Sequence, residues 1–192
     1  MNRHPVLLEL EELLVSLAPG AVASIRDEIV EPVYSLRMWY YGTDTYGDLS
    51  PSLMLPKESI RRERLLTKGQ KAPHHIWCAD ELTDIGAAYS ADLNDARVSE
   101  LCNTWLAQLT VALEEKEALL PIRETVQRAC LRLNALDWRE YARISDDFIV
   151  FPADASHTFC NDYEEMVASV PAEKIELLRS QNMLGTQIWY EL

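Results

Sequence analysis

The chain has 192 residues, of which 48% are hydrophobic, and it carries 18 basic and 31 acidic side chains for a net charge of −13. This length suits a single domain over residues 1–192, and the hydrophobic content can build a buried core, which excludes general disorder. The negative field repels phosphate backbones, and no apolar run approaches the roughly 20 residues of a membrane helix, so we expect neither a nucleic-acid partner nor a membrane partner.

The N-terminal segment predicts helices and gives no sign of a secretory signal. Leucines at helical spacing predict a first helix over 5–17, which the Pro19-Gly20 pair ends, and a second short helix over 22–29. Glutamates interrupt the apolar core that a secretory signal would need. We therefore expect a cytoplasmic protein.

A β-hairpin is predicted next. Residues 33–41 are rich in aromatic and branched side chains and form the clearest strand, which a turn-rich loop joins to a second strand over 52–55. A helix follows over 56–66. Residues 74–78 suit a short edge strand or an extended loop.

The middle of the chain is strongly helical. Residues 92–120 predict a long helix, and Pro121 breaks it and begins another. The two helices make a long central αα pair. Cys102 and Cys130 lie on their apolar sides, where a free thiol behaves as a small hydrophobic group, so we expect structural thiols.

The C-terminal part predicts one or two strands and two helices. Residues 148–151 are wholly apolar, as in a buried strand, and 152–154 end that strand. Helices over 161–168 and 171–181 follow, with a final strand over 186–190. The expected fold is α+β: a small, mostly antiparallel sheet built from the N-terminal hairpin and the C-terminal strands, packed against several helices.

The charge is distributed unevenly along the chain. Residues 73–120 and 144–192 each carry a net −7, whereas residues 61–72 carry +4. Acidity of this kind keeps a protein soluble and also accelerates encounter with a basic protein. We interpret the basic cluster over 61–72 as a solvated helix face.

No common catalytic fingerprint occurs in the sequence. There is no glycine-rich phosphate loop, no nucleophile elbow of the Gly-x-Ser-x-Gly type and no His-Glu-x-x-His helix, so no catalytic residue is assigned. Acidic pairs such as Asp146-Asp147 and Glu164-Glu165 are expected to be solvated surface pairs.

One repeated spacing offers an alternative, enzymatic hypothesis. His75 and Cys78 are three residues apart, as are His157 and Cys160, and two imidazoles with two thiolates can fill a tetrahedral Zn²⁺ shell. The same residues could serve a thiol enzyme, with Cys160 as nucleophile and His157 as base. The competing interpretation is that both cysteines pack beside aromatic neighbours, and it leaves the protein without a cofactor.

Aromatic and acidic side chains gather at the end of the first strand and in the loop after it. Trp and Tyr are enriched in the energetically dominant parts of interfaces. The predicted partner-binding residues are therefore Trp39, Tyr41, Asp44, Tyr46 and Asp48.

The order of segments also resembles a known class of proteins. The hairpin over 33–55, the segment 76–82, the helical middle, the stretch 147–154 and the Val-Pro-Ala-Glu-Lys run from Val170 follow one another as in small bacterial proteins encoded beside polymorphic-toxin genes, some of which are immunity proteins. The resemblance implies a non-catalytic binding protein that neutralises a basic effector. No site residue is carried over from it.

Overall fold

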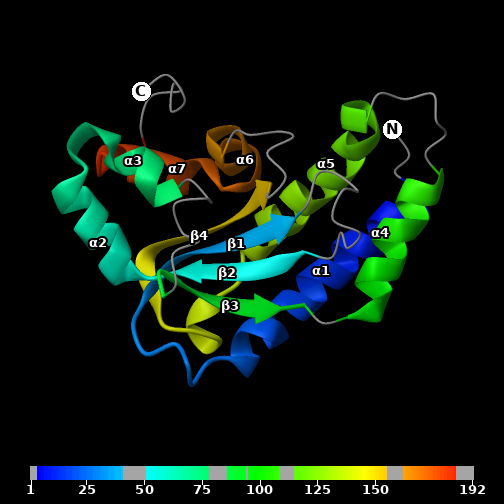
Figure 1. The fold of residues 1–192 in the computed structure, drawn as a ribbon, viewed down its shortest axis with the longest axis horizontal. Coiled ribbons are helices and arrows are strands. Elements are labelled where there is room, and N and C mark those ends of the chain that lie inside the picture. The colour runs from blue at the N-terminus through cyan, green and yellow to red at the C-terminus, as the bar shows by residue number, and fades with distance from the viewer. Residues whose placement is uncertain are drawn as a thin grey trace.

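The computed structural model describes residues 4–40, 51–77, 86–93, 95–108, 115–154 and 162–184, and a four-stranded sheet lies at its centre (Figure 1). The elements, in chain order, are α1 (Pro5–Ser24), β1 (Val33–Tyr40), β2 (Ser52–Pro56), α2 (Glu58–Thr67), a 3-10 turn (Gly69–Lys71), α3 (Ala72–Trp77), β3 (Ala88–Asp92), α4 (Ala96–Gln108), α5 (Glu115–Leu133), a second 3-10 turn (Trp138–Glu140), β4 (Ile144–Asp154), α6 (Asp162–Ser169) and α7 (Ala172–Ser180).

The sheet is mixed, with strand order β3-β2-β1-β4. β2 is antiparallel to both β1 and β3, whereas β4 runs parallel to β1. The α+β class and the hairpin are confirmed. The C-terminal strand pairs in parallel because the long, helix-containing connection from β1 to β4 carries the chain back to the starting end of the sheet.

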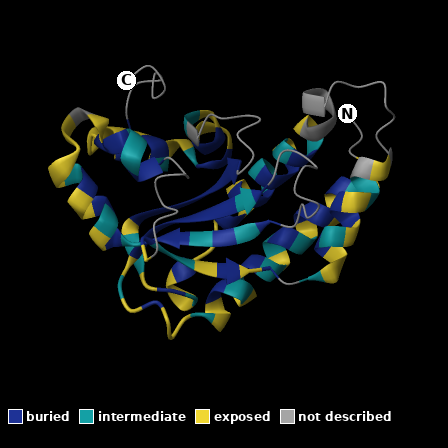
Figure 2. Ribbon diagram, in the orientation of Figure 1, coloured by how far each residue is buried: buried dark blue, intermediate teal, exposed yellow. Residues whose placement is uncertain are grey.

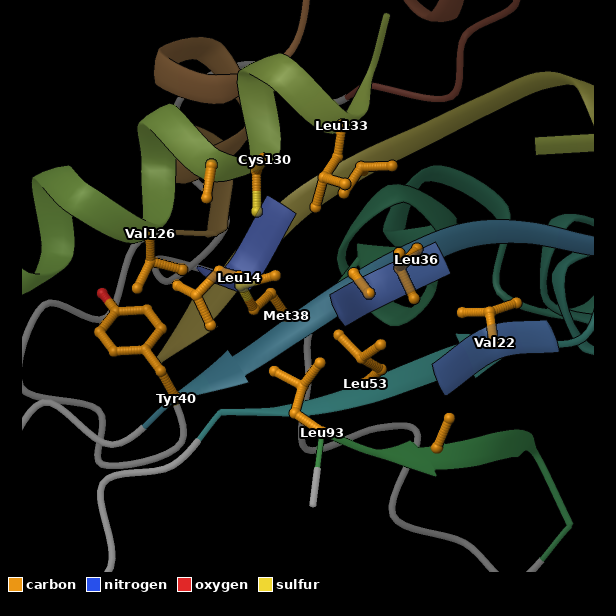
Figure 3. Close-up of a cluster of buried hydrophobic side chains, with 14 of the residues drawn as sticks. Leu14, Val22, Leu36, Met38, Tyr40, Leu53, Leu93, Val126, Cys130 and Leu133 are labelled. Carbon is orange, nitrogen blue, oxygen red and sulfur yellow. The ribbon is translucent and has the colours of Figure 1, made fainter. Parts of the chain in front are cut away.

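One face of the sheet is covered by α1, α4 and α5, which contribute to the larger hydrophobic cluster (Figure 3). Leu36, Met38 and Tyr40 of β1 point into it, because every second residue of a strand faces the same side of the sheet. Cys102 and Cys130 are buried free thiols, and burial raises the pKa of Cys130. Both are therefore structural thiols, as predicted.

The opposite face carries a smaller cluster built from α3, α6 and α7. Trp77 lies at its centre, with its ring edge-on to Tyr34 and Phe151 and its indole N–H donating to the carbonyl of Met183 at 2.7 Å. Burial on both faces accounts for the nearly continuous buried run of β1 (Figure 2). The sheet is the middle of three layers.

The first helix is longer than its sequence predicts. α1 continues through Pro19 to Ser24, and the residues that follow form turns, so the expected helix over 22–29 is wrong. Proline removes one hydrogen bond from a helix interior. Burial of Ala18 and Val22 against the sheet offsets that loss, because the apolar stripe continues past the proline.

Two short elements also differ from the prediction. Residues 72–77 form α3, so neither the edge strand nor the extended loop expected from residue 74 is found there. Gly69 adopts φ +54° and lets the chain turn from α2 into this new helix. The strand β3 was not predicted at all. Its sequence, Ala-Tyr-Ser-Ala-Asp, has little β propensity, and pairing with β2 stabilises it as an edge strand.

Two prolines predicted to end elements lie inside them. Pro121 lies within α5, so the helix begins at Glu115 and not at the proline. Pro152 lies within β4, which continues to Asp154. The proline is tolerated there because β4 is an edge strand. Both central helices contain residues that pack with α1 in the larger cluster. The predicted final strand over 186–190 falls outside the described residues.

Candidate functional site

The predicted partner-binding residues fall mostly outside the described part of the chain. Trp39 is described and is half-buried at the carboxyl end of β1, where Ala153 of β4 is its partner in the ladder. Tyr41, Asp44, Tyr46 and Asp48 fall outside it. Trp39 therefore lies at the end of the sheet from which the predicted partner-binding loop departs.

Of the four predicted zinc residues, the structure describes one, His75. His75 is half-buried in α3, next to His74, whose ring centroid lies 5.4 Å away. Cys78, His157 and Cys160 fall outside the described residues. Among the residues that are described, no three His, Cys, Asp or Glu side chains gather as they would around a metal ion. The four-residue zinc site stays a prediction of the sequence.

The carboxyl ends of the parallel strands β1 and β4 carry a buried polar cluster that the sequence did not predict. Tyr40 and Asp154 are ladder partners there, and both are buried. Glu165 of α6 is only 1% exposed, and it accepts hydrogen bonds from Arg123 Nε at 2.5 Å and Gln127 Nε2 at 2.9 Å, both from α5. In open α/β sheets, ligands commonly bind at this end of parallel strands.

The electrostatics of this cluster follow from its burial. Burial raises the pKa of Glu165, and the hydrogen bonds from Gln127 and Arg123 oppose that shift without cancelling it. Burial also raises the pKa of Tyr40, and the charges of Glu165 and Asp154 raise it further. The clearest role of the cluster is to fasten α6 to α5 across the end of the sheet.

The acidic pairs are not solvated as pairs. Glu164 is exposed while Glu165 is buried, and Asp146 is fully exposed while Asp147 is buried. Each pair spans a boundary between surface and interior because neighbouring residues on a helix or strand point in different directions. The Glu165 position could have been found from its spacing with Met166 and Ser169, which lie on the buried side of α6.

The hydroxyl of Tyr40 lacks a hydrogen-bond partner within the described residues, although Tyr40 is 1% exposed. We expect Tyr40→Phe to leave the free energy of unfolding unchanged or to raise it by up to about 1 kcal/mol, because the substitution removes a buried, unsatisfied group. Urea unfolding followed by circular dichroism measures the change.

Tyr34 on the same strand provides the matched control for Tyr40. Its hydroxyl donates to the carbonyl of Ile76 at 2.7 Å, so Tyr34→Phe is expected to lower the free energy of unfolding by about 1 kcal/mol. If Tyr40→Phe destabilises the protein as much as Tyr34→Phe, the Tyr40 hydroxyl is satisfied in solution and the expectation is wrong.

The basic cluster over 61–72 is only partly solvated. Arg61 and Arg64 are buried; Arg61 lies over the ring of Tyr34, with its Cζ 5.0 Å from the ring centroid, and Arg37 of β1 donates to the Tyr34 hydroxyl at 3.4 Å. Arg64 donates to the carbonyl of His75, and Arg37 donates to the carbonyl of Ile76 at 2.5 Å. Both arginines thereby bind carbonyls in the last turn of α3, where a helix favours positive charge.

Arg61 has a different partner from the other two buried arginines. Its guanidinium binds both oxygens of Asp147, at 2.7 and 3.0 Å, and also pairs with Glu58 at 2.7 Å. The interpretation of the cluster as a solvated helix face is therefore wrong for its buried members. The three-residue spacing of Glu58, Arg61 and Arg64, which places them on one side of α2, was the available signal.

An exposed surface on α6 and α7 combines apolar and acidic side chains. Val167 is 48% exposed and Leu177 is 42% exposed, and both belong to helices whose other sides are buried. Of the basic residues here, Lys174 donates inward to the carbonyl of Phe148 at 2.9 Å, whereas Arg179 pairs with Glu176 at the surface and donates to Tyr163. We define the α6–α7 surface by its exposed members: Glu164, Val167, Glu173, Glu176 and Leu177.

Comparison of the chain with protein-family models, with curated proteins and with solved structures gave no match. A separate finding concerns the helices: in the described ranges, none is both long and apolar enough to cross a membrane. The functional proposal therefore depends on the charges and contacts of the chain itself.

Proposed function

We propose that this protein is a non-catalytic binding module whose acidic surface binds a basic protein, in the manner of an immunity protein that neutralises a basic effector. The observation that carries the proposal is where the charges lie. Within the described residues, the buried charged groups are five carboxylates and three guanidiniums: Glu11, Glu58, Asp147, Asp154 and Glu165, with Arg37, Arg61 and Arg64. Burial thus removes charges of both signs, and the described side chains outside the core keep a small net negative charge.

The α6–α7 surface is the proposed contact. Its exposed carboxylates attract a basic partner over distance, and complementary charge raises the rate of association more than the final affinity. Val167 and Leu177 supply apolar area that a partner can bury after encounter. The bond of Lys174 to the carbonyl of Phe148 directs its positive charge inward, whereas Arg179 and Glu176 neutralise each other and leave Glu173 as the unpaired carboxylate of α7 within the described residues. Trp39 and the predicted loop residues extend the proposal to the carboxyl end of β1.

A capture experiment with matched variants tests the proposal. The tagged protein is incubated with native lysate of its source at low and moderate salt, and any stoichiometric partner is identified by mass spectrometry. Val167→Asp is expected to weaken binding of that partner by about tenfold or more, because it places a charge in apolar contact area. Glu173→Lys is expected to slow association, with the difference shrinking as salt is added.

Two variants on α2 serve as controls for the capture experiment. Leu66 is 86% exposed and Glu63 is exposed, and both lie outside the α6–α7 surface. Leu66→Asp and Glu63→Lys repeat the two substitutions without touching the proposed contact, so we expect unchanged binding. Absence of a stoichiometric partner at both salt concentrations, or equal effects of the two sets of variants, contradicts the proposal.

The immunity-like part of the proposal has its own readout. The captured protein is expected to be basic and to inhibit growth when it is expressed alone. Co-expression with this chain is expected to restore growth, and Val167→Asp is expected to reduce that protection. If the captured protein is harmless when it is expressed alone, the binding function is still supported and the immunity role is contradicted.

A further inference from the structure

A hollow of about 330 Å³ opens at the end of the sheet where β1 and β4 begin. Two segments form its walls: the turn that follows α1, and the second 3-10 turn with the residues that join it to β4. They lie side by side in Figure 1 and are tied by a hydrogen bond from Val33 N to the carbonyl of Arg143 at 3.0 Å. The hollow is far from the carboxyl ends of the same strands, where Tyr40 and Glu165 lie.

Two arginines cross-link the walls reciprocally. Arg26, from the first wall, donates to the carbonyl of Glu140 in the second at 3.1 Å. Arg143, from the second wall, donates to the carbonyl of Val30 in the first at 3.0 Å. Each bond fixes a guanidinium in place without neutralising its charge, because the acceptor is a backbone carbonyl.

The lining carries three arginines and one aspartate, although the protein as a whole is acidic. Neither Arg26 nor Arg143 pairs with a carboxylate within the described residues, and each guanidinium has five N–H donors, of which one is used. Arg139 also lines the hollow but pairs with exposed Asp146 at 3.2 Å, and Asp27 is the one carboxylate in the lining. Two oriented, uncompensated guanidiniums suit a doubly charged oxyanion, which arginine binds with paired hydrogen bonds.

The size of the hollow and its apolar walls limit the kinds of ligand that it can bind. The volume falls at the lower end of the range for small-molecule sites, about 300–1,000 Å³, and exceeds what a bare phosphate fills. Ile29, Val30 and Ala142 provide apolar wall for an organic body. The net charge of −13 repels long polyanions. A small ligand is repelled much less, because salt screens it from protein charges that lie more than about 8–10 Å away. We propose that this hollow binds a small organic phosphate monoester through Arg26 and Arg143.

Calorimetric titration of the full chain tests the proposal with three probes. Phenyl phosphate is expected to bind with one site and a dissociation constant below about 1 mM, which corresponds to roughly −4 kcal/mol. Inorganic phosphate, which lacks the body, and benzenesulfonate, which carries a single charge, are each expected to bind about tenfold more weakly. Equal binding of phenyl phosphate and benzenesulfonate rejects a dianion site.

Glutamine variants locate the site. Arg26→Gln and Arg143→Gln keep an amide donor for the wall carbonyl and remove the positive charge, and each is expected to weaken phenyl phosphate binding about tenfold. Arg62→Gln, which alters an exposed arginine on α2, is the control and is expected to bind normally. Circular dichroism confirms that each variant is folded.

Amide chemical shifts provide a readout that does not depend on the variants. Addition of phenyl phosphate is expected to shift resonances within 26–30 and 139–143. Shifts confined to other residues, absence of binding at 10 mM of the probe, or binding that neither arginine substitution weakens overturns the proposal.

Discussion

Asp147→Ala is expected to lower the free energy of unfolding by about 3–5 kcal/mol, because it leaves Arg61 buried without its bidentate partner. Arg61 is 4% exposed and binds both oxygens of Asp147, and Ser145 donates to the same carboxylate at 2.7 Å. Glu58 stays as a second partner of Arg61, so we expect the lower part of that range. Urea unfolding monitored by fluorescence measures the change.

The neighbouring residue is a matched control. Asp146 is fully exposed and pairs with exposed Arg139, so Asp146→Ala is expected to change stability by about 0–1 kcal/mol. A double variant, Arg61→Met with Asp147→Leu, removes both charges and is expected to recover most of the loss. Equal costs for Asp146→Ala and Asp147→Ala would show that the buried pair does not hold α2 to β4.

The same ion pair predicts a dependence on pH. Burial opposes ionisation of Asp147, but the hydrogen bonds from Arg61 and Ser145 and the charge of Arg61 outweigh it, so its pKa lies below the ordinary value. A carboxyl group whose pKa is lowered by folding stabilises the protein fully above its unfolded-state pKa, about 4, and loses that contribution as pH falls through the folded-state pKa. The difference between wild type and Asp147→Ala is therefore expected to shrink below about pH 4.

Asn134→Ala is expected to be as damaging, with a loss of about 2–5 kcal/mol, because it leaves several buried backbone groups without a partner. The side-chain amide of Asn134 donates to the carbonyls of Cys130, Val150 and Ser169, at 3.0, 2.6 and 3.0 Å, and its oxygen accepts from Val150 N at 2.9 Å. β4 is an edge strand of the described sheet, and Asn134 binds both backbone groups of Val150 much as a neighbouring strand would.

Two further variants separate this role from helix propensity. Asn103 is exposed on α4, so Asn103→Ala is expected to stay within about 0.5 kcal/mol of wild type. Asn134→Asp keeps an acceptor for Val150 N but loses the amide donors and buries a charge, so we expect it to be no better than alanine. A stable Asn134→Asp variant at neutral pH would mean that the donors contribute little.

Patterns of apolar and small residues were sufficient for the parts of the fold that local rules govern. The 33–41 and 52–55 segments appear as β1 and β2 because alternating aromatic and branched residues suit a pleated sheet covered by helices. The helices α6 and α7 begin within one residue of the predicted starts, since Asn161 and Pro171 are helix-start signals. Cys102 and Cys130 were assigned to the core from helical periodicity alone.

Local signals failed where tertiary contacts outweighed them. Pro19 and Pro121 were expected to end or begin helices, but burial of the flanking apolar stripe keeps both prolines inside helices. β3 has no strand signal of its own and exists through its ladder with β2. Propensity is a weak energy per residue, and packing of a whole face exceeds it.

The sequence by itself determined the α+β class, the hairpin, the helical middle and the surplus of negative charge. Only the tertiary structure decided where the charges lie: the arginines of the 61–72 cluster divide between core and solvent, and acidic neighbours such as Glu164 and Glu165 take opposite environments. The physical reason is that charge is a sum over residues, whereas burial depends on which face of an element meets another. The cross-linked hollow at Arg26 and Arg143 depends on the same kind of contact, because its two walls are more than 100 residues apart in the sequence.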